Sequence, residues 1–204
     1  MRLGFCPICC SLPVLCCISS MAMAGRAAIE ECNRRKGGGV SLERHLERTV
    51  LVATEPARLS AALDDPARFR AHMSKPSAVM LGGSMRYELD AAAGQAVGSI
   101  IRMTRNVLGL TLSVSETVIE RMPPVRKVWE TTGSPRLLIL AWYRMGFDIT
   151  LEGTGSRLTV FIDYRLPETM GLATISRALG PACARCCLSR IVTDAGSVSR
   201  AVAG

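Results

Sequence analysis

Few residues in this sequence could support metal chemistry. The chain has two histidines, His45 and His72, which exclude a centre built from several histidines. Two CxxC pairs begin at Cys6 and Cys183, and their four thiols match the ligand number of a structural zinc site. The first pair lies in an apolar run and the second on a predicted helix, whereas zinc knuckles occupy turns. We therefore expect no metal site.

The residues that could act as acids, bases or nucleophiles form no recognised catalytic motif. There is no P-loop, dinucleotide-binding fingerprint or Ser-His-Asp set. His72 could be a general base at a cavity mouth, although a helix-end histidine more often bonds to backbone or water. Strand alternation brings no two carboxylates convincingly together among Glu88, Asp90, Glu116, Glu120 and Asp163. We assign no catalytic residue and no cofactor.

The nine cysteines are unevenly distributed along the chain. Five lie within the first 17 residues, and none occurs from Leu42 to Pro181. A fold that depended on disulfides would carry cysteines through its body, and an odd number leaves at least one free thiol. This pattern favours a reducing, cytoplasmic compartment for the folded part.

The chain is basic, with 25 Lys and Arg against 17 Asp and Glu. The arginines are spread over several predicted strands, and aromatic residues make up only 4% of the chain. No stacking platform for single-stranded nucleic acid is therefore visible, and we expect no nucleic-acid partner. We interpret the charges as a solvated basic surface, with peripheral contact to an anionic membrane as the alternative.

Residues 1–41 differ from the rest of the chain. Arg2, an apolar run from Leu3 to Ile18 and the small residues of Ala22-Met23-Ala24 follow the order of a secretory signal. The run is short for a membrane span, which needs about 20 apolar residues. A start codon at Met21 or Met23, an export signal or membrane anchor, and an acylated cysteine cluster are all open alternatives. A genuine signal would make the protein exported or membrane-anchored.

A basic, glycine-rich linker from Cys32 to Ser41 completes this first segment. We expect one folded domain over residues 42–198, because the hydrophobic periods of strands and helices continue without interruption after the linker. Residues 199–204 are left as a tail.

Hydrophobic periods predict the elements of the domain. Thr49–Ala53 is a β-branched strand, and two short helices follow, one starting at Glu55-Pro56 and one at Asp65-Pro66. Six strands come next, separated by turn residues such as Gly133-Ser134-Pro135 and Gly153–Ser156. They are Ser84–Leu89, Val97–Met103, Leu110–Val118, Val125–Thr131, Arg136–Leu151 and Leu158–Leu166.

The final segment is expected to be a long helix. Apolar residues recur at three- and four-residue spacing from Leu172 to Ala195, along a helix restarted by Gly180-Pro181. Successive hairpins make an antiparallel meander, and this helix can cover one of its faces. The fold class is α+β, with about seven antiparallel strands, two short helices after the first strand and a long C-terminal helix.

From about Leu46 to Ala195 the chain resembles the START-like superfamily, also called SRPBCC, which includes polyketide cyclases and lipid-transfer domains. The resemblance to bacterial SRPBCC proteins lies in Pro123–Thr131, Arg144–Phe147 and Phe161–Tyr164. It implies the helix-grip fold, in which a curved antiparallel sheet wraps around a long C-terminal helix with a hydrophobic cavity between them. These are signatures of the fold and do not fix the chemistry.

Alternation along the last two strands places one set of side chains on a common face. We expect this face and the helix residue Cys187 to line an apolar cavity with two phenolic hydroxyls, a composition typical of ligand pockets. A solid core is the alternative. The predicted ligand-binding residues are Ile139, Ala141, Tyr143, Met145, Phe147, Val160, Ile162, Tyr164 and Cys187, with Ile149 on the same face.

The opposite face of these strands carries large apolar side chains where water would be expected. They suggest a partner, such as a second subunit in a homo-oligomer, unless the two faces are reversed at the Leu137–Trp142 end. The residues are Leu138, Leu140, Trp142 and Phe161.

The favoured function is binding or transfer of a small hydrophobic ligand without transforming it. A lipid, an isoprenoid quinone or a polyketide-like compound would fit, with Tyr143 and Tyr164 orienting a polar head. The alternatives are a cyclase- or hydratase-type enzyme, using these tyrosines or His72, and an interaction module with a filled core.

Overall fold

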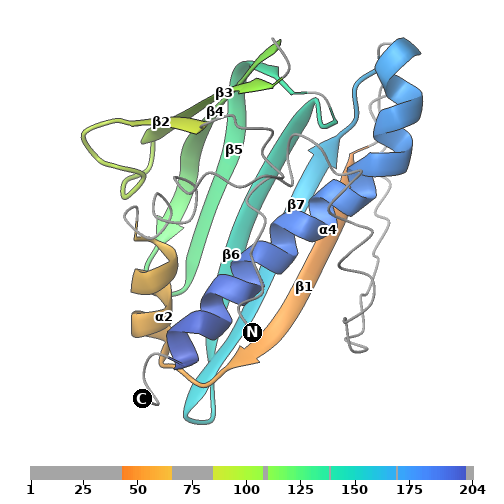
Figure 1. The fold of residues 1–204 in the computed structure, drawn as a ribbon. Coiled ribbons are helices and arrows are strands. Elements are labelled where there is room, and N and C mark those ends of the chain that lie inside the picture. Colours follow the sequence, from red (N-terminus) through yellow and green to blue (C-terminus); the bar gives the residue numbers. More distant parts are fainter. Residues whose placement is uncertain (1–42, 66–84, 108–109, 138, 169, 201–204) are drawn as a thin grey trace, which may run out of the picture.

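The computed structural model describes residues 43–65, 85–107, 110–137, 139–168 and 170–200. Residues 1–41, the predicted second helix, His72 and Leu138 lie outside these ranges. The elements (Figure 1) are β1 (Arg44–Val52), α2 (Pro56–Leu63), β2 (Met85–Leu89), β3 (Ile100–Val107), β4 (Leu110–Met122), β5 (Arg126–Arg136), β6 (Trp142–Glu152), β7 (Gly155–Arg165) and α4 (Met170–Arg200).

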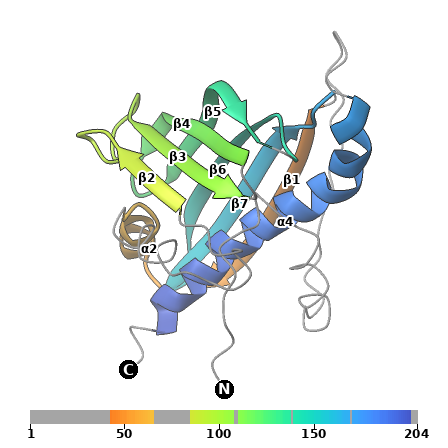
Figure 2. The ribbon, with the colours of Figure 1, turned by 45° about the horizontal axis from the view of Figure 1, so that its top comes forward.

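The seven strands form one antiparallel sheet in the order β1-β7-β6-β5-β4-β3-β2. Each strand from β2 to β6 pairs with the next strand along the chain, and β7 also pairs with β1. β1 and β2 therefore lie at opposite edges of the sheet, and the chain between them carries α2 (Figures 1 and 2). This arrangement confirms the predicted α+β fold with a curved sheet and a long C-terminal helix.

Local sequence explains the hairpin between β6 and β7. Glu152 pairs with Gly155, so the loop is the two residues Gly153-Thr154, and Gly153 has a φ of 59°. Glycine adopts this left-handed conformation without a Cβ penalty, as such tight turns require. The turn predicted over residues 153–156 is confirmed.

The turn predicted at Gly133-Ser134-Pro135 is wrong, because β5 continues through it to Arg136. The segment forms a bulge instead. One residue lies between Ser113 and Ser115 of β4, whereas three residues lie between their partners Arg136 and Thr132 of β5. The extra residues bend the strand without ending it.

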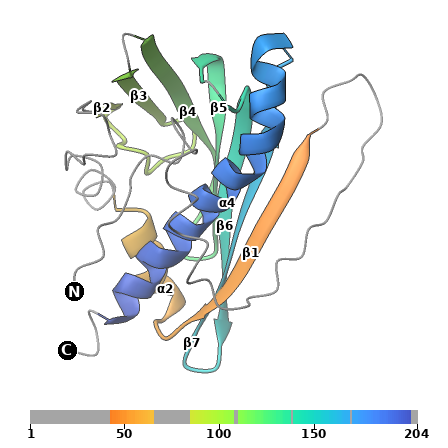
Figure 3. The same cartoon turned by 45° about the vertical axis from the view of Figure 1, so that its right-hand side comes forward.

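The C-terminal helix is continuous from Met170 to Arg200, with Pro181 in its interior, and does not restart there. An internal proline removes one backbone hydrogen bond and bends a helix, and the first turns of α4 run at an angle to the rest (Figure 1). α4 packs against β1, β7 and α2 (Figure 3). Among the described residues, no helix combines the length and apolar character needed to cross a bilayer.

A buried carboxylate attaches α2 to the far strands of the sheet. Asp64, directly after α2, accepts hydrogen bonds from Arg121 Nε (3.0 Å) and Nη2 (2.7 Å) of β4 and forms an ion pair with Lys127 of β5. Gln95, in the loop between β2 and β3, donates to the Asp64 carbonyl oxygen at 3.4 Å. The end of α2 is therefore fixed to β4, β5 and this loop.

Candidate functional site

The candidate site is located by the face of the sheet on which it lies and by the strands that form it. The face that carries α4 is called the concave face, and the opposite one the convex face. The α4-covered half consists of β1, β6 and β7, and the distal half consists of β2, β3, β4 and β5. In Figure 3 the strands β2, β3 and β4 curve away from α4.

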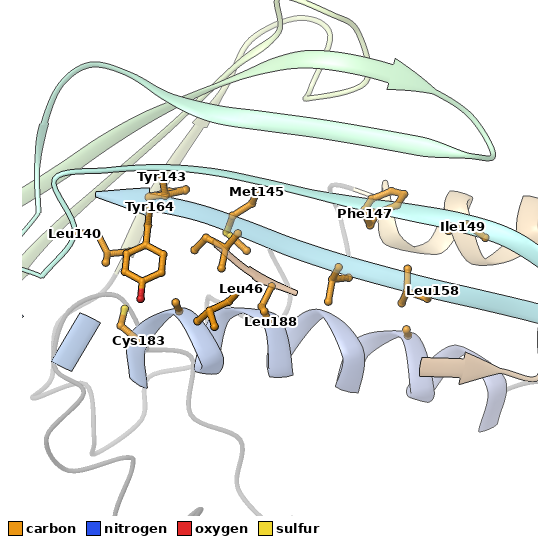
Figure 4. Close-up of a cluster of buried hydrophobic side chains, with 14 of the residues drawn as sticks. Leu46, Leu140, Tyr143, Met145, Phe147, Ile149, Leu158, Tyr164, Cys183 and Leu188 are labelled. Carbon is orange, nitrogen blue, oxygen red and sulfur yellow. The ribbon is translucent and has the colours of Figure 1, made fainter. Parts of the chain in front are cut away.

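The main hydrophobic core lies between the α4-covered half and α4 (Figure 4). It brings together most of the sequence-predicted ligand residues: Ile139, Tyr143, Met145, Phe147, Ile149, Val160, Ile162 and Tyr164. Cys187 is half-buried and packs against this cluster. Leu46 of β1 and Cys183, Ala184 and Leu188 of α4 complete the packing. Much of the predicted face is therefore in contact with the helix.

Tyr164 is packed between the sheet and α4. Its ring extends from β7 toward Cys183 (Figure 4), and its side chain is 1% exposed. A Cβ at Gly180 would lie 3.6 Å from the Tyr164 ring and 2.5 Å from Leu166 Cδ2. Gly180 thus lets the helix approach this strand closely, and Tyr164 fills the space between the two elements.

Just before β6 the structure has the alternative in which the two faces are reversed at the Leu137–Trp142 end. Alternation predicts Leu140 on the convex face, but it is buried in the core, and it predicts Ala141 on the concave face, but it is exposed. The predicted strand Arg136–Leu151 does not exist as one element, since β5 ends at Arg136 and β6 begins at Trp142. Strict alternation therefore does not extend across the intervening residues.

Among the described residues, only Trp142 and Phe161 of the predicted apolar patch lie on the convex face, because Leu140 is buried in the core. Phe161 lies against Gly146, where a Cβ would come within 2.7 Å of its ring, and the Arg126 guanidinium stands 5.4 Å from the ring centroid. The guanidinium groups of Arg144 and Arg165 stand 5.4 Å and 4.6 Å from the centroid of the Trp142 ring. Both aromatic side chains thus contact cations of the protein itself.

A buried polar cluster occupies the concave face at the border between the two halves. The hydroxyl of Tyr143 in β6 donates a hydrogen bond to the carboxylate of Glu116 in β4. Both residues are buried, Tyr143 at 4% and Glu116 at 6% exposure. A carboxylate removed from water requires such a partner, because an unpaired buried charge is costly.

Thr131 of β5 holds Tyr143 in place. The paired register of β5 and β6 ends at Glu130 and Arg144. One residue further along, the Thr131 hydroxyl donates to the Tyr143 carbonyl oxygen (3.0 Å) and accepts from the Tyr143 backbone N–H (3.2 Å). A side chain thus satisfies backbone groups just beyond the end of the β5–β6 register.

Further side chains of the distal half surround this cluster on the same face. Met103, Leu112 and Val118 are buried but do not belong to the main core beneath α4. Arg105, which pairs in register with Leu112, is also buried, at 3% exposure. The concave face of the distal half therefore combines apolar side chains with one buried carboxylate and one buried guanidinium, and the phenol of Tyr143 in β6 lies at its border.

Sequence reasoning considered Glu116 only as one of five carboxylates that form no pair, and it assigned neither Arg105 nor Thr131 to a site, although the strand period contains a signal for Glu116 and Arg105. In β4 the apolar phase runs through Leu112, Val114 and Val118, and Glu116 interrupts it. In β3, Arg105 follows Ile101 and Met103 in the same phase. A charged residue on the apolar phase of a strand is expected to be buried and paired.

The next feature is the arrangement of side chains that could bind a metal ion. Among them, no group of three or more histidine, cysteine, aspartate or glutamate side chains could hold a metal ion. Cys183 is buried and Cys186 is half-buried in α4, whereas Cys6 and Cys9 lie outside the described ranges.

Several solved structures share this architecture. An aromatase/cyclase from Streptomyces sp. R1128 aligns with a TM-score of 0.58 at 16% identity, covering 78% of this chain and 96% of its own. A point mutant of norcoclaurine synthase from Thalictrum flavum, in complex with a transition-state analogue, aligns with a TM-score of 0.55 at 16% identity, covering 81% and 97%. A protein from Thermus thermophilus aligns with a TM-score of 0.54 at 12% identity, covering 79% and 99%.

Sequence comparison adds no closer relative. No protein-family model matches the chain, and no curated protein matches it. The structural likeness confirms the predicted helix-grip fold, and at these identities it shows the fold alone.

Proposed function

We propose that the protein binds a small hydrophobic ligand on the concave face of the distal half, with Tyr143 and Glu116 orienting the ligand's polar group. The observation that carries this proposal is the buried Tyr143–Glu116 hydrogen bond on a face whose other buried side chains are mostly apolar, with Arg105 and Thr131 as the polar exceptions. A few fixed polar groups within an apolar lining are what a small-molecule site uses to orient its ligand.

The division of the sheet supports this position for the ligand. The face beneath α4 is filled by contacts between sheet and helix, from Leu46 to Leu188. Met103, Leu112 and Val118 lie on the same concave face outside that packing. Burial of apolar ligand surface against them would contribute about 25 cal/mol per Å². The ligand class is the one expected from the sequence: a lipid, an isoprenoid quinone or a polyketide-like compound.

The first test is native mass spectrometry of the full chain, purified without detergent and compared with its denatured mass. The proposal predicts a reproducible additional mass that can be extracted into organic solvent, or one acquired from a lipid extract. No additional mass in either experiment would contradict ligand binding and favour an interaction module with a filled core.

Variants test the polar anchor. Tyr143→Phe removes the hydroxyl that bonds to Glu116 and that would contact the ligand's polar group, so it should weaken binding of the recovered compound about two- to tenfold, since a hydrogen bond contributes about 0.5–1.5 kcal/mol. Tyr164→Phe is the matched control, because it removes the same hydroxyl from the side chain packed beneath α4. Equal losses in both variants would contradict the assignment of Tyr143 as the anchor.

A second candidate function is catalysis on the bound compound. A phenol that donates to a carboxylate can transfer a proton to or from a ligand placed beside it, and two neighbours in fold are an aromatase/cyclase and norcoclaurine synthase. Mass spectrometry of the compound before and after incubation distinguishes the two functions. Conversion that is lost in Tyr143→Phe at retained affinity supports an enzyme, whereas an unchanged compound supports a binding protein.

A further inference from the structure

The two halves of the convex face differ in how their arginines are paired. In the α4-covered half, Arg144 pairs with Glu130 (2.9 Å) and Arg165 pairs with Glu43 (3.0 Å). The distal half also holds one paired arginine: Arg126, at the start of β5 and opposite Asp148 of β6, bonds to Glu120 (2.9 Å) and Asp148 (2.7 Å), and these two carboxylates raise its pKa. The charges of these three arginines are therefore neutralised within the protein.

Three arginines of the distal half lack such partners. Arg86 of β2, Arg102 of β3 and Arg136 of β5 are exposed, and in the described part of the chain none of them forms an ion pair or side-chain hydrogen bond. One carboxylate, Glu88, lies opposite Arg102 in the register but forms no ion pair with it within the described ranges. The distal half therefore presents positive charge that is not compensated by ion pairs.

The sheet register gathers these arginines around a set of hydroxyl groups. One row across four strands reads Arg86, Thr104, Ser113 and Arg136, and the next row reads Glu88, Arg102, Ser115 and Thr132. Adjacent strands are about 4.8 Å apart, so the first row spans about 14 Å between its two arginines. Arginine side chains reach far enough from these positions to approach a common anion.

A hollow of about 240 Å³ lies at the centre of this region, beside the bulge of β5. No carboxylate belongs to its lining. The residues that line it are Ile100, Arg102, Ser113, Val114, Ser115, Thr132, Gly133 and Ser134. The lining thus holds four hydroxyl groups and one guanidinium, although the Thr132 hydroxyl already bonds to Thr117 (3.1 Å) and to the Ser115 carbonyl oxygen (3.4 Å). The volume is below the roughly 300 Å³ at which drug-sized pockets begin.

We infer that this hollow binds a phosphate group. Arginine matches the geometry and charge of phosphate oxygens, and serine and threonine hydroxyls donate further hydrogen bonds to them. Arg102 contacts the group from within the hollow, and Arg86 and Arg136 add positive potential from the flanking row. The phosphate belongs to a small soluble ester or to the headgroup of a lipid, and both sources supply the same chemistry.

The test for the soluble source titrates the full chain with inorganic phosphate and with glycerol phosphate at constant ionic strength. Amide NMR signals of Gly133 and Ser134 should shift and saturate. Arg102→Gln should weaken the apparent affinity about tenfold or more, whereas Arg144→Gln, which removes one charge from the paired part of the same face, should leave it unchanged. Shifts without saturation, or equal losses in both variants, would mean general electrostatic attraction and overturn the inference.

The test for the lipid source is flotation with vesicles of one part phosphatidic acid to four parts phosphatidylcholine. Binding by the wild-type protein and Arg144→Gln, but not by Arg102→Gln, assigns the phosphate to a headgroup. Saturable phosphate binding without flotation assigns it to a soluble ester. Failure of both experiments overturns the inference and leaves the concave-face ligand unaffected, because the two sites lie on opposite faces of the sheet.

Discussion

The α4-covered half and the distal half of the sheet use the same strand geometry for different purposes. Beneath α4, side chains such as Phe147 and Ile162 pack into one cluster with the helix. In the distal half, the concave face buries Glu116 and Arg105 among apolar residues, and the convex face leaves three arginines without ion pairs among the described residues. One half is built as a stable support, and the features that could recognise a ligand are concentrated in the other.

The largest expected effect compares core truncations in the two halves. Ile162→Ala removes a fully buried side chain from the main cluster and should lower the free energy of unfolding by about 4 kcal/mol. Met103→Ala, in the distal half outside that cluster, should cost about 2 kcal/mol. Denaturant unfolding measures both changes, and equal losses would contradict the division into a support and a recognition half.

The second effect concerns the link between α2 and the distal half. Asp64→Asn removes the charge that Arg121 and Lys127 share in a largely buried setting and should cost about 3 kcal/mol. Glu152→Gln is the control, since its ion pair with Arg157 is exposed and should contribute less than about 1 kcal/mol. If the two variants lost the same stability, α2 would not depend on the buried link.

A smaller effect tests close packing in the α4-covered half. A Cβ at Gly146 would lie 2.7 Å from the Lys127 carbonyl oxygen and from the Phe161 ring, so Gly146→Ala should cost about 2 kcal/mol. A Cβ at Gly196 of α4 would contact nothing within 4 Å, and Gly196→Ala should stabilise the helix by up to about 1 kcal/mol. Thermal unfolding gives the sign of each change, and a neutral Gly146→Ala would mean that both the Phe161 ring and the Lys127 backbone can move away.

The smallest expected effect is the loss of stability at low pH that comes from Asp90, in the loop between β2 and β3. The Ser99 hydroxyl (2.6 Å) and the Ile100 backbone N–H (2.7 Å) donate to Asp90 and hold its pKa below the ordinary value of 3.8. Because the pKa is lowered on folding, the stabilisation is complete above pH 3.8 and disappears as the pH falls through the lower, folded-state pKa. Carboxyl NMR titration should show the Asp90 pKa rising toward 3.8 in Ser99→Ala. An unchanged pKa would assign the shift to the backbone.

Much of the framework could be predicted from local patterns. Alternation placed Tyr143 and Tyr164 on one face, and turn residues located the hairpin after β6. The alternation of apolar and polar residues does not show where a strand ends. Leu140 and Ala141 were therefore predicted on the wrong faces, and the bulge at Gly133-Ser134-Pro135 was predicted as a turn. The Tyr143–Glu116 pair joins β6 to β4 across β5, so it depends on strand register, which a single strand's sequence does not encode.

The central claim is that a hydrophobic ligand contacts the concave face of the distal half. Methyl NMR spectra of the full chain, recorded with and without the compound recovered by native mass spectrometry, test it most directly. We predict that the methyl signals of Met103, Leu112 and Val118 shift, while those of Ile149, Leu158 and Ile162 beneath α4 change little. Shifts confined to the residues beneath α4 would contradict the claim and place the ligand between the helix and the sheet.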